Sequence, residues 1–365
     1  MTVSEDISLT EVRDRIDALD QQIQELINQR AACAQKVAEI KMRNSEGDAV
    51  FYRPEREAQV LRTVKGRNKG PLGGEEMARL FREIMSACLA LEKPMHIAFL
   101  GPEGTFTQAA ALKHFGHSVV SVPMGAIDEV FREVESGAAH YGVVPVENST
   151  EGMINHTLDM FMNSQAKICG EVQLRIHHHL LAPEGVDAEK IEKVYSHQQS
   201  LAQCRKWLDS HWRKLERVAV SSNAEAARRV KSEPNSAAIA GDMAAELYGL
   251  TKIAKNIEDR PDNTTRFLII GRDTVPPSGI DKTSILVSMR NKPGALYQLL
   301  EPFHRHNISL TRIETRPSSR GTWAYVFYID FEGHATDPGI KLVLDEITQE
   351  AMELKILGSY PVGVL

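Results

Sequence analysis

Two cations stand on a predicted helix where its apolar face should continue. Apolar or small residues recur every three or four positions across residues 12–40, and Arg30 takes one of these positions. Lys41 lies eleven residues further on, which in an α-helix is about 20° around the axis and about 16 Å along it. Burial of an unpaired cation is unfavourable, so an anion is expected to complete the site. The alternative is that both side chains reach solvent or pair with Glu55 or Glu92.

Arg13 is a third cation on the same predicted helix, about 25 Å from Arg30. It can join the ligand of Arg30 only from a second chain, unless that ligand is very long. A helix of about 50 Å is also too long for a monomeric unit of about ninety residues. The spacing therefore predicts a site shared within a dimer. A plain dimerisation coiled coil is the alternative, and the cations on its seam disfavour it.

Four polar clusters in the middle of the chain follow strand-like runs. They are GPEGTFT (101–107), ENSTEG (147–152), SHQQ (196–199) and NTTRF (263–267). Open α/β sheets bind ligands at the carboxyl ends of their strands, so these clusters are expected to line a cleft. The first is a Gly-rich turn suited to an anion, but neither GxGxxG nor GK[ST] occurs, so no nucleotide is expected. Loop and helix-cap chemistry at Asn148 and Ser149 is the alternative.

The elements that carry these residues divide the chain into three units, so a multidomain protein is predicted. Residues 1–93 are expected to be all-helical because of their three-four periodicity. The three helices are predicted over residues 10–43, 54–64 and 75–92. Residues 95–273 alternate strands and helices, which indicates a two-lobed α/β domain like a periplasmic binding protein. After the linker VPPSG, residues 281–365 follow the order βαββαβ of a ferredoxin-like α+β domain.

Composition excludes several other classes of protein. The chain has 365 residues, of which 42% are hydrophobic, and a net charge of −6 without a long basic run, so no nucleic-acid partner is expected. No apolar run approaches the ~18 residues of a membrane span. The polar start is unlike a signal peptide, and the four scattered cysteines indicate reduced thiols, so a cytoplasmic location is expected. No cofactor or metal is expected, because the histidines of 177–179 would alternate faces on a strand.

The helical unit resembles the all-helical class of chorismate mutase over essentially its whole length. The resemblance rests on Arg13, Asp20, Arg30, Lys41, the run PERE and Glu92. It implies that Arg30, and Arg13 from the other chain, bind the two carboxylates of chorismate. It also implies that Lys41 hydrogen-bonds the ether oxygen of the breaking bond and that Glu55 holds a ring hydroxyl. The rearrangement is unimolecular, so the protein has only to hold a reactive conformer and stabilise growing negative charge.

Two positions of this unit depart from parts of that family. Glu92 stands where some members have Gln and others Glu, and a Glu can donate to the ether oxygen only when it is protonated. Mutase activity is therefore predicted to fall above neutral pH. Cys88 stands where some members have a hydroxyl residue that contacts the substrate.

The middle unit resembles prephenate dehydratase over its whole length. The resemblance rests on GPEGTFTQAA, GVVPVENSTEG, YSHQQSLAQC, AAIAGDMAAELYGL and NTTRF, in this order. It implies that Thr265 of the TRF motif is essential, and we interpret Thr265 as the donor to the leaving hydroxyl. Gln198 replaces the usual Pro. The resemblance places seven more residues in or beside the cleft: Thr105, Phe106, Asn148, Ser149, Gln199, Arg266 and Phe267. Arg266 is either a carboxylate anchor or part of a structural ion pair.

The C-terminal unit resembles the ACT domain of phenylalanine-regulated enzymes, through NKPGALYQLLEPF (291–303) and TRIETRP (311–317). Where the family usually has ESRP, this chain has ETRP. The resemblance implies that L-phenylalanine binds between ACT domains of paired chains, with its carboxylate at a helix N-terminus. The residues implied are Asn291, Gly294, Ala295, Leu296, Glu314, Thr315 and Arg316. A turn and strand edge that serve only dimerisation are the alternative.

Together, the three resemblances imply a bifunctional enzyme of phenylalanine biosynthesis, both an isomerase and a lyase. It would rearrange chorismate to prephenate, then dehydrate and decarboxylate prephenate to phenylpyruvate, under feedback inhibition by L-phenylalanine. A homodimer or a dimer of dimers is expected. Two alternatives remain, a cleft that also acts on arogenate and a catalytically weak phenylalanine-sensing protein.

Overall fold

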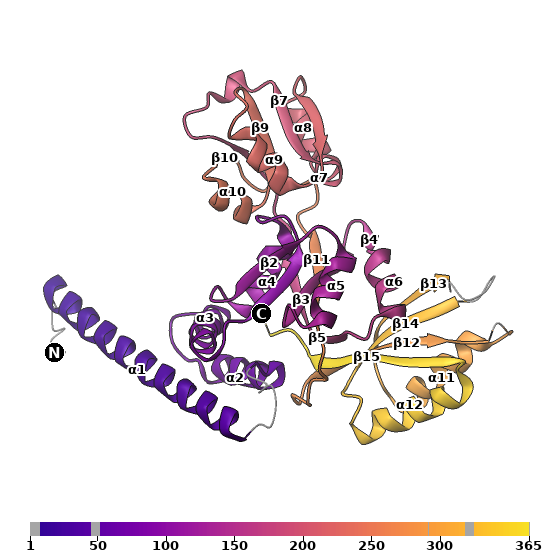
Figure 1. Ribbon diagram of the computed structural model, residues 1–365. Helices are drawn as coiled ribbons and strands as arrows, with labels where there is room; N and C mark the ends of the chain where they lie inside the picture. Colours follow the sequence, from indigo (N-terminus) through magenta and orange to yellow (C-terminus); the bar gives the residue numbers. More distant parts are fainter. Residues whose placement is uncertain (1–7, 45–51, 291, 318–324, 365) are drawn as a thin grey trace, which may run out of the picture.

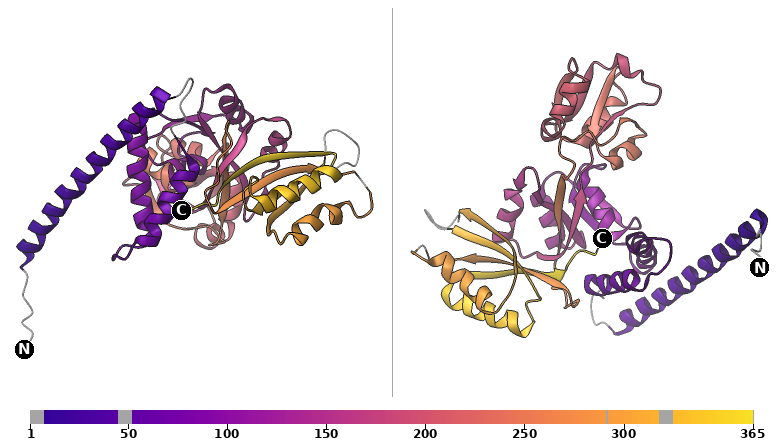
Figure 2. Two further views of the ribbon diagram at one scale, coloured as in Figure 1. Left: turned by 90° about the horizontal axis from the view of Figure 1, so that it is seen from below. Right: turned by 180° about the vertical axis from the view of Figure 1, so that it is seen from behind.

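The computed structural model describes residues 8–44, 52–290, 292–317 and 325–364, and the chain forms three units (Figure 1). The first unit is all-helical, as predicted. Its helices are α1 (Leu9–Asn44), α2 (Pro54–Arg67) and α3 (Gly74–Glu92). α1 has 36 residues and is about 54 Å long. Every described residue before Ile27 is exposed, and Figures 1 and 2 show this half of α1 extending away from the remaining chain.

The second unit begins with a lobe built on a mixed sheet in the order β2-β1-β3-β11-β5. The strands are β1 (His96–Leu100), β2 (Val120–Met124), β3 (Tyr141–Asn148), β5 (Lys167–Arg175) and β11 (Thr264–Gly271), and the short β4 (Gly152–Met153) pairs with β3. β11 runs antiparallel to both of its neighbours. One face of the sheet packs on α4 (Phe106–Phe115), and the other packs on α5 (Ile127–Ser136) and α6 (Asn155–Asn163).

The second lobe is inserted between β5 and β11, so the chain crosses between the lobes twice. Its sheet has the order β10-β6-β9-β7-β8. The strands are β6 (His179–Ala182), β7 (Lys193–His197), β8 (Glu216–Val220), β9 (Ser236–Ala240) and β10 (Thr251–Ala254). The helices are η1 (Ala188–Lys190), α7 (Gln198–Gln203), α8 (Arg205–His211), α9 (Asn223–Val230) and α10 (Asp242–Tyr248). The predicted two-lobed α/β organisation is confirmed.

The C-terminal unit is ferredoxin-like, as predicted, with a sheet in the order β13-β14-β12-β15. Its elements are β12 (Asp281–Ser288), α11 (Ala295–Arg305), β13 (Leu310–Pro317), β14 (Tyr325–Glu332), α12 (Pro338–Glu350) and β15 (Glu353–Pro361). Helices α11 and α12 cover one face of this sheet. Leu286, Tyr328 and Tyr360, on the other face, belong to the hydrophobic core of the first lobe.

The helical unit is also anchored to the rest of the chain. Arg62 on α2 donates to Ile280 O at 2.8 Å and to Ser278 Oγ at 3.0 Å, both in the linker before β12. Lys65 donates to Val364 O at 3.1 Å, so α2 contacts both ends of the C-terminal unit. Within the described ranges, no helix is long and apolar enough to cross a membrane.

Candidate active sites

Asn148 and Thr265 form the centre of a polar group where the two lobes meet. β3 ends at Asn148, and the antiparallel register places Asn148 opposite Thr265 on β11. Asn148 Nδ2 donates to Thr265 Oγ1 at 2.8 Å, and both residues are buried. Thr265 Oγ1 therefore acts as an acceptor. No hydrogen bond between described residues uses its own proton, which leaves the hydroxyl able to donate to a ligand.

A series of hydrogen bonds ties this pair to the second lobe. Asn148 Nδ2 also donates to Asn263 Oδ1 at 2.8 Å, and Asn263 Nδ2 donates to Gln203 Oε1 at 3.0 Å. Gln203 Oε1 also accepts from His178 Nε2 at 3.0 Å. Burial lowers the pKa of His178, so this ring is neutral at pH 7. The sequence prediction missed Gln203, Asn263 and His178, although Gln203 and Asn263 lie inside motifs that it quoted.

The neighbouring hydroxyls, Ser149 and Thr105, are held by backbone groups. Ser149 Oγ accepts from Thr264 N at 3.0 Å, which fixes the loop after β3 against the start of β11. Thr105 caps α4, since its Oγ1 accepts from Gln108 N at 3.4 Å, and it also donates to Leu100 O at 3.2 Å. Both residues lie at the carboxyl ends of strands, as predicted, and both shape their loops.

Phe106 marks a close approach of the two lobes. Its ring lies edge-on to that of His178, which lies in the crossing between β5 and β6, and the ring centroids are 5.5 Å apart. A Cβ at Gly241, just before α10, would lie only 2.6 Å from Phe106 Cε1, so this contact requires glycine. Gln199 lies partly buried in the first turn of α7. No hydrogen bond joins Gln199 to Thr265 in the part of the chain that the structure describes.

The three consecutive histidines have separate partners. His177 Nδ1 lies 2.8 Å from Glu258 Oε1, and His179 Nε2 lies 3.1 Å from Asp242 Oδ1. The sequence interpretation put all three on a strand. In the structure only His179 belongs to β6. The rings of His177 and His179 stack with their centroids 6.5 Å apart, whereas His178 Nε2 contacts Gln203 Oε1.

Two residues that the sequence placed in or beside the cleft point elsewhere. Arg266 lies on the opposite face of β11 from Thr265, because side chains alternate along a strand. Its guanidinium forms ion pairs with Glu171 at 2.9 Å and with Asp330 at 2.8 Å, which corresponds to the ion-pair alternative. Phe267 is 1% exposed and packs in the hydrophobic core beneath α4, so it supports the sheet and does not line the cleft.

In the helical unit, Arg30, Lys41 and Glu92 form one cluster, because α1 packs on α3. Burial raises the pKa of Glu92, and the nearby charges of Lys41 and Arg30 partly oppose this rise. Glu92 Oε2 is buried and has no hydrogen-bond partner among the described residues. The two cations that share a face of α1 therefore lie near a carboxyl oxygen that a ligand can bind.

Glu55 and Cys88 lie buried in the same helical unit. Glu55 Oε1 is 3.8 Å from Arg53 Nη1, whereas Glu55 Oε2 is a second buried oxygen without a hydrogen-bond partner in the described part of the chain. Arg13 is exposed on the projecting half of α1. One chain alone therefore does not bring Arg13 to Arg30.

The predicted effector residues occupy two elements of the C-terminal unit. Gly294 has a φ of 83° and caps α11, with Ala295 and Leu296 in the first turn. β13 carries Glu314 and Thr315, and it also carries Arg316, which pairs with Asp159 of α6 at 2.8 Å. Asn291 lies outside the described residues.

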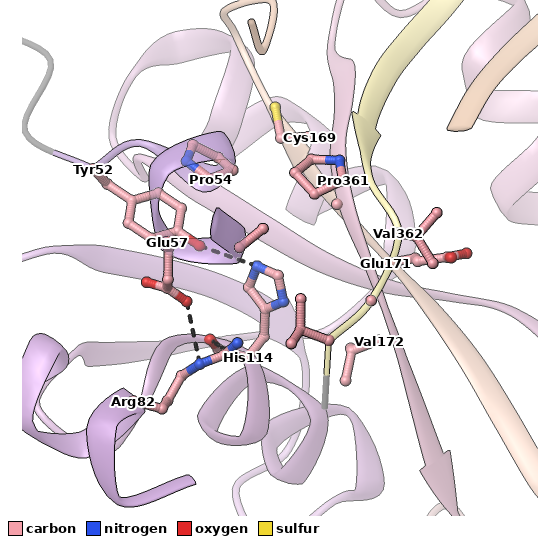
Figure 3. A pocket seen from close by; sticks show the side chains of 14 residues that line it. Tyr52, Pro54, Glu57, Arg82, His114, Cys169, Glu171, Val172, Pro361 and Val362 are labelled. Atoms are coloured by element: carbon pink, nitrogen blue, oxygen red, sulfur yellow. Dashed lines mark hydrogen bonds and ion pairs between the residues drawn. The ribbon is translucent and has the colours of Figure 1, made fainter. Parts of the chain in front are cut away.

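A further polar cluster, which the sequence did not predict, lies where the three units meet. Figure 3 shows Tyr52, Glu57 and Arg82 around His114 of α4, beside the C-terminal segment 361–362. Arg82 Nε lies 3.1 Å from Glu57 Oε1, and Arg82 Nη1 donates to a carbonyl oxygen at the end of α4 at 3.0 Å. Tyr52 Oη lies 3.2 Å from His114 Nε2.

Comparison with known proteins assigns successive parts of the chain to three families. Chorismate mutase type II matches residues 12–93, prephenate dehydratase matches 97–275, and the ACT domain matches 283–348. A bifunctional chorismate mutase/prephenate dehydratase of Stutzerimonas stutzeri is 67% identical over 365 residues and is covered completely, as is this chain. One of the same description from Pseudomonas aeruginosa is 67% identical over 359 residues, 98% of each chain.

Among solved structures, prephenate dehydratase from Arthrobacter aurescens in complex with L-Phe is 33% identical, with a TM-score of 0.69. The match covers 73% of this chain and 90% of that one. The fold and the three family matches define a multidomain enzyme with a helical chorismate mutase unit and an α/β prephenate dehydratase unit. The chain belongs to the family of bifunctional chorismate mutase/prephenate dehydratases.

Proposed function

We propose that this chain is an enzyme of phenylalanine biosynthesis that converts chorismate to prephenate and prephenate to phenylpyruvate. Residues 1–93 perform the first reaction, residues 95–273 the second, and residues 281–365 regulate the enzyme. The observation that carries the proposal is the buried Thr265 hydroxyl, fixed by Asn148 with its own proton available. The similarity to bifunctional relatives over the full length supports it.

In the dehydratase reaction, prephenate takes up one proton and releases CO₂ and water, and the ring becomes aromatic. The C–O bond of the ring hydroxyl breaks while the electrons of the C–CO₂⁻ bond enter the ring. Thr265 donates a hydrogen bond to the departing hydroxyl, and Asn148 orients Thr265 by donating to it at 2.8 Å. Phe106 supplies an apolar wall for the CO₂, and Gln199 and the loops that Thr105 and Ser149 shape bind the remaining polar groups.

In the mutase reaction, the protein holds chorismate in the reactive conformer. Arg30 binds one carboxylate and Arg13 of the partner subunit binds the other. Lys41 and protonated Glu92 donate to the ether oxygen as negative charge grows there. Glu55 accepts from a ring hydroxyl, and Cys88 contacts the ring. The raised pKa of Glu92 supports its role as a donor.

The exposed apolar stripe of α1 supports a dimer. Val12, Ile16, Leu19, Ile23 and Leu26 are all between 42% and 63% exposed in one chain. A helix with this stripe requires a partner surface. We propose that α1 pairs with the helical unit of a second chain, in a homodimer or a dimer of dimers. We also propose a cytoplasmic location.

We propose L-phenylalanine as the effector, bound at the N-terminus of α11 and along β13. Gly294, Ala295 and Leu296 offer backbone N–H groups to the amino-acid carboxylate, and Glu314, Thr315 and Arg316 of β13 complete the site. Leu296 and Ile313 are 45% and 42% exposed, which supports a second C-terminal unit covering them. Asn291 belongs to the same proposed site.

The test gives purified protein chorismate alone and follows chorismate loss and phenylpyruvate formation, with and without L-phenylalanine. Phenylpyruvate that forms and is suppressed by L-phenylalanine is the expected result. Accumulation of prephenate would leave only the mutase part standing. Rates on prephenate and arogenate, measured side by side, decide whether the cleft prefers the proposed substrate.

A further inference from the structure

The two strands that carry Asn148 and Thr265 present charged residues on their other face. In the antiparallel register of β3 and β11, Asn148 is opposite Thr265 and the adjacent Glu147 is opposite Arg266. Side chains alternate along a strand. Asn148 and Thr265 therefore point to the lobe junction, while Glu147 and Arg266 point to the C-terminal unit. On each strand, two adjacent residues therefore connect the two faces of the sheet: one side chain lies at the proposed site and the next faces the C-terminal unit.

Arg266 lies at the centre of a buried network between the two units. Its Nε is 2.9 Å from Glu171 Oε2 on β5, and its Nη1 is 2.8 Å from Asp330 Oδ2 on β14. Its Nη2 donates to Tyr360 Oη at 3.1 Å on β15. Lys282 of β12 pairs with Glu171 Oε1 at 2.7 Å. Two cations and two carboxylates balance one another, so the network is closed and neutral.

Glu147 has its own partner on the C-terminal unit. Arg312 Nη1 of β13 lies 2.9 Å from Glu147 Oε2, and the Arg312 side chain is 14% exposed. Four residues further along β13, Arg316 binds Asp159 of α6 through two hydrogen bonds of 3.0 and 2.8 Å. The strand proposed to bind the effector is therefore bound to the strand that ends at Asn148.

The two units are packed too tightly for these pairs to adapt by sliding. β15 lies against β5, and a Cβ at Gly358 would lie 2.1 Å from Ile168 O. Tyr328 Oη donates to Leu158 O at 2.7 Å, and Tyr328 and Tyr360 both belong to the core of the first lobe. A shift of the C-terminal sheet must therefore move the strands of the first lobe, because close-packed interiors do not deform freely.

We propose that Arg266 and Glu147 are positioning residues of the dehydratase site, through which the C-terminal unit holds β11 and β3 so that Asn148 meets Thr265. The proposal rests on the proposed function, since it concerns the same site. An effector bound to β13 and α11 reaches the site by changing how Asp330 and Arg312 hold these two strands. Neither Arg266 nor Glu147 touches the substrate.

The first test is Asp330→Asn in the full-length enzyme. Asn keeps an oxygen for the bond from Ser284 Oγ, which is 2.6 Å from Asp330 Oδ1, and removes the charge that holds Arg266. The kcat for prephenate is expected to fall on the order of tenfold, which is the size of measured coupling effects. The KM for prephenate and the mutase rate should stay within about twofold, because no substrate contact changes.

Lys355→Met is the matched control. Lys355 Nζ also crosses between the units, donating to Phe161 O at 2.8 Å, but it reaches the end of α6 and neither β3 nor β11. Its dehydratase kcat is expected to stay within about twofold of the unmodified enzyme. Equal losses in Asp330→Asn and Lys355→Met, or no loss in either, would overturn the proposal.

A charge exchange decides the matter if Asp330→Asn lowers the mutase rate through misfolding. Glu147→Arg and Arg312→Glu should each lower the dehydratase kcat, and the double variant should recover at least part of the loss. No recovery would count against Glu147 as a positioning residue. The unmodified enzyme must first convert prephenate. If it does not, the proposed function fails, and that failure is distinct from the failure of this inference.

Discussion

At the scale of single residues, the dehydratase site depends on the orientation of one hydroxyl. Thr265 is buried and accepts from Asn148, and Asn148 is itself fixed by bonds to Asn263 and from Thr150 N at 3.0 Å. An amide that is already oriented costs little reorganisation during the reaction. Because Thr265 Oγ1 accepts from Asn148, its own proton remains available for a ligand.

Replacement of Thr265 tests this role directly. Thr265→Ala is expected to lower the dehydratase kcat by about 10²-fold or more, because the donor to the leaving hydroxyl is lost. Thr265→Ser keeps the hydroxyl and should retain activity to within about tenfold. The mutase rate, measured on the same preparations, should not change. A Thr265→Ala enzyme with a normal dehydratase rate would refute the assignment.

The pH dependence of the mutase reports on Glu92. Burial raises the pKa of Glu92 against the opposing charges of Lys41 and Arg30. Below this pKa the protonated carboxyl donates to the ether oxygen, and above it the carboxylate repels the developing charge. Mutase kcat is expected to fall as the pH rises through the raised pKa of Glu92, and Glu92→Gln should flatten the profile. An unchanged profile in Glu92→Gln would show that another group titrates.

Single residues also show which parts of the site could not be predicted from the sequence. The motifs predicted that Asn148 and Thr265 belong to one site, because both clusters were expected to follow strands. For NTTRF this was wrong, since Thr265 lies at the start of β11, and it meets Asn148 because β11 runs antiparallel to β3. The motifs placed both Arg266 and Thr265 in or beside the cleft. Side chains alternate along a strand, but the sequence does not show which face of β11 packs on the C-terminal unit. Gln203 and His178 were missed because their role depends on the meeting of two lobes distant in sequence.

At the scale of elements, α1 carries an apolar stripe that stays exposed in a single chain. Its length and three-four spacing were predictable, and its packing on α3 brings Arg30 and Lys41 to Glu92. The strand-like runs recognised in the middle unit were HIAFLG, YGVVPV, KVYSH, RVAVSS, SAAIA and RFLIIG, and they did not include β2, β5, β6 and β10. β2 and β10 are short and only partly buried, and β5 reads as a run of mixed polarity because each face has a different neighbour.

A mixing experiment tests whether α1 completes a site in another chain. Arg13→Ala and Arg30→Ala should each abolish most mutase activity. A mixed dimer has one site with both arginines, so co-expression of the two variants should restore about one quarter of the normal mutase rate, given random pairing around a two-fold axis. The dehydratase rate serves as the measure of protein amount. If the mixture is no more active than either variant alone, each chain builds its own site.

At the scale of the whole molecule, the three units meet around His114. Helix α4 of the first lobe ends there, Tyr52, Glu57 and Arg82 approach from the helical unit, and the C-terminal segment passes beside them (Figure 3). Burial raises the pKa of Glu57, and Arg82 opposes that rise. Docking of the domains was not predictable from the sequence, because it depends on complementary surfaces and has no periodic pattern.

This junction should make the stability of the enzyme sensitive to acid. Burial, aided by the charge of Arg82, holds the pKa of His114 well below its usual value of 6.5. As the pH falls through 6.5, the unfolded chain takes up a proton that the folded chain does not, so the free energy of unfolding falls by up to about 1.4 kcal/mol per pH unit.

His114→Gln removes this titration. Urea midpoints of His114→Gln and the unmodified enzyme should therefore converge between pH 7.5 and 5.5. Tyr52→Phe, which loses the contact to His114 Nε2 but keeps the histidine, should instead lie below the unmodified enzyme at every pH. Parallel midpoints for His114→Gln would mean that His114 is protonated in the folded enzyme, and that the three units do not exclude water from this junction.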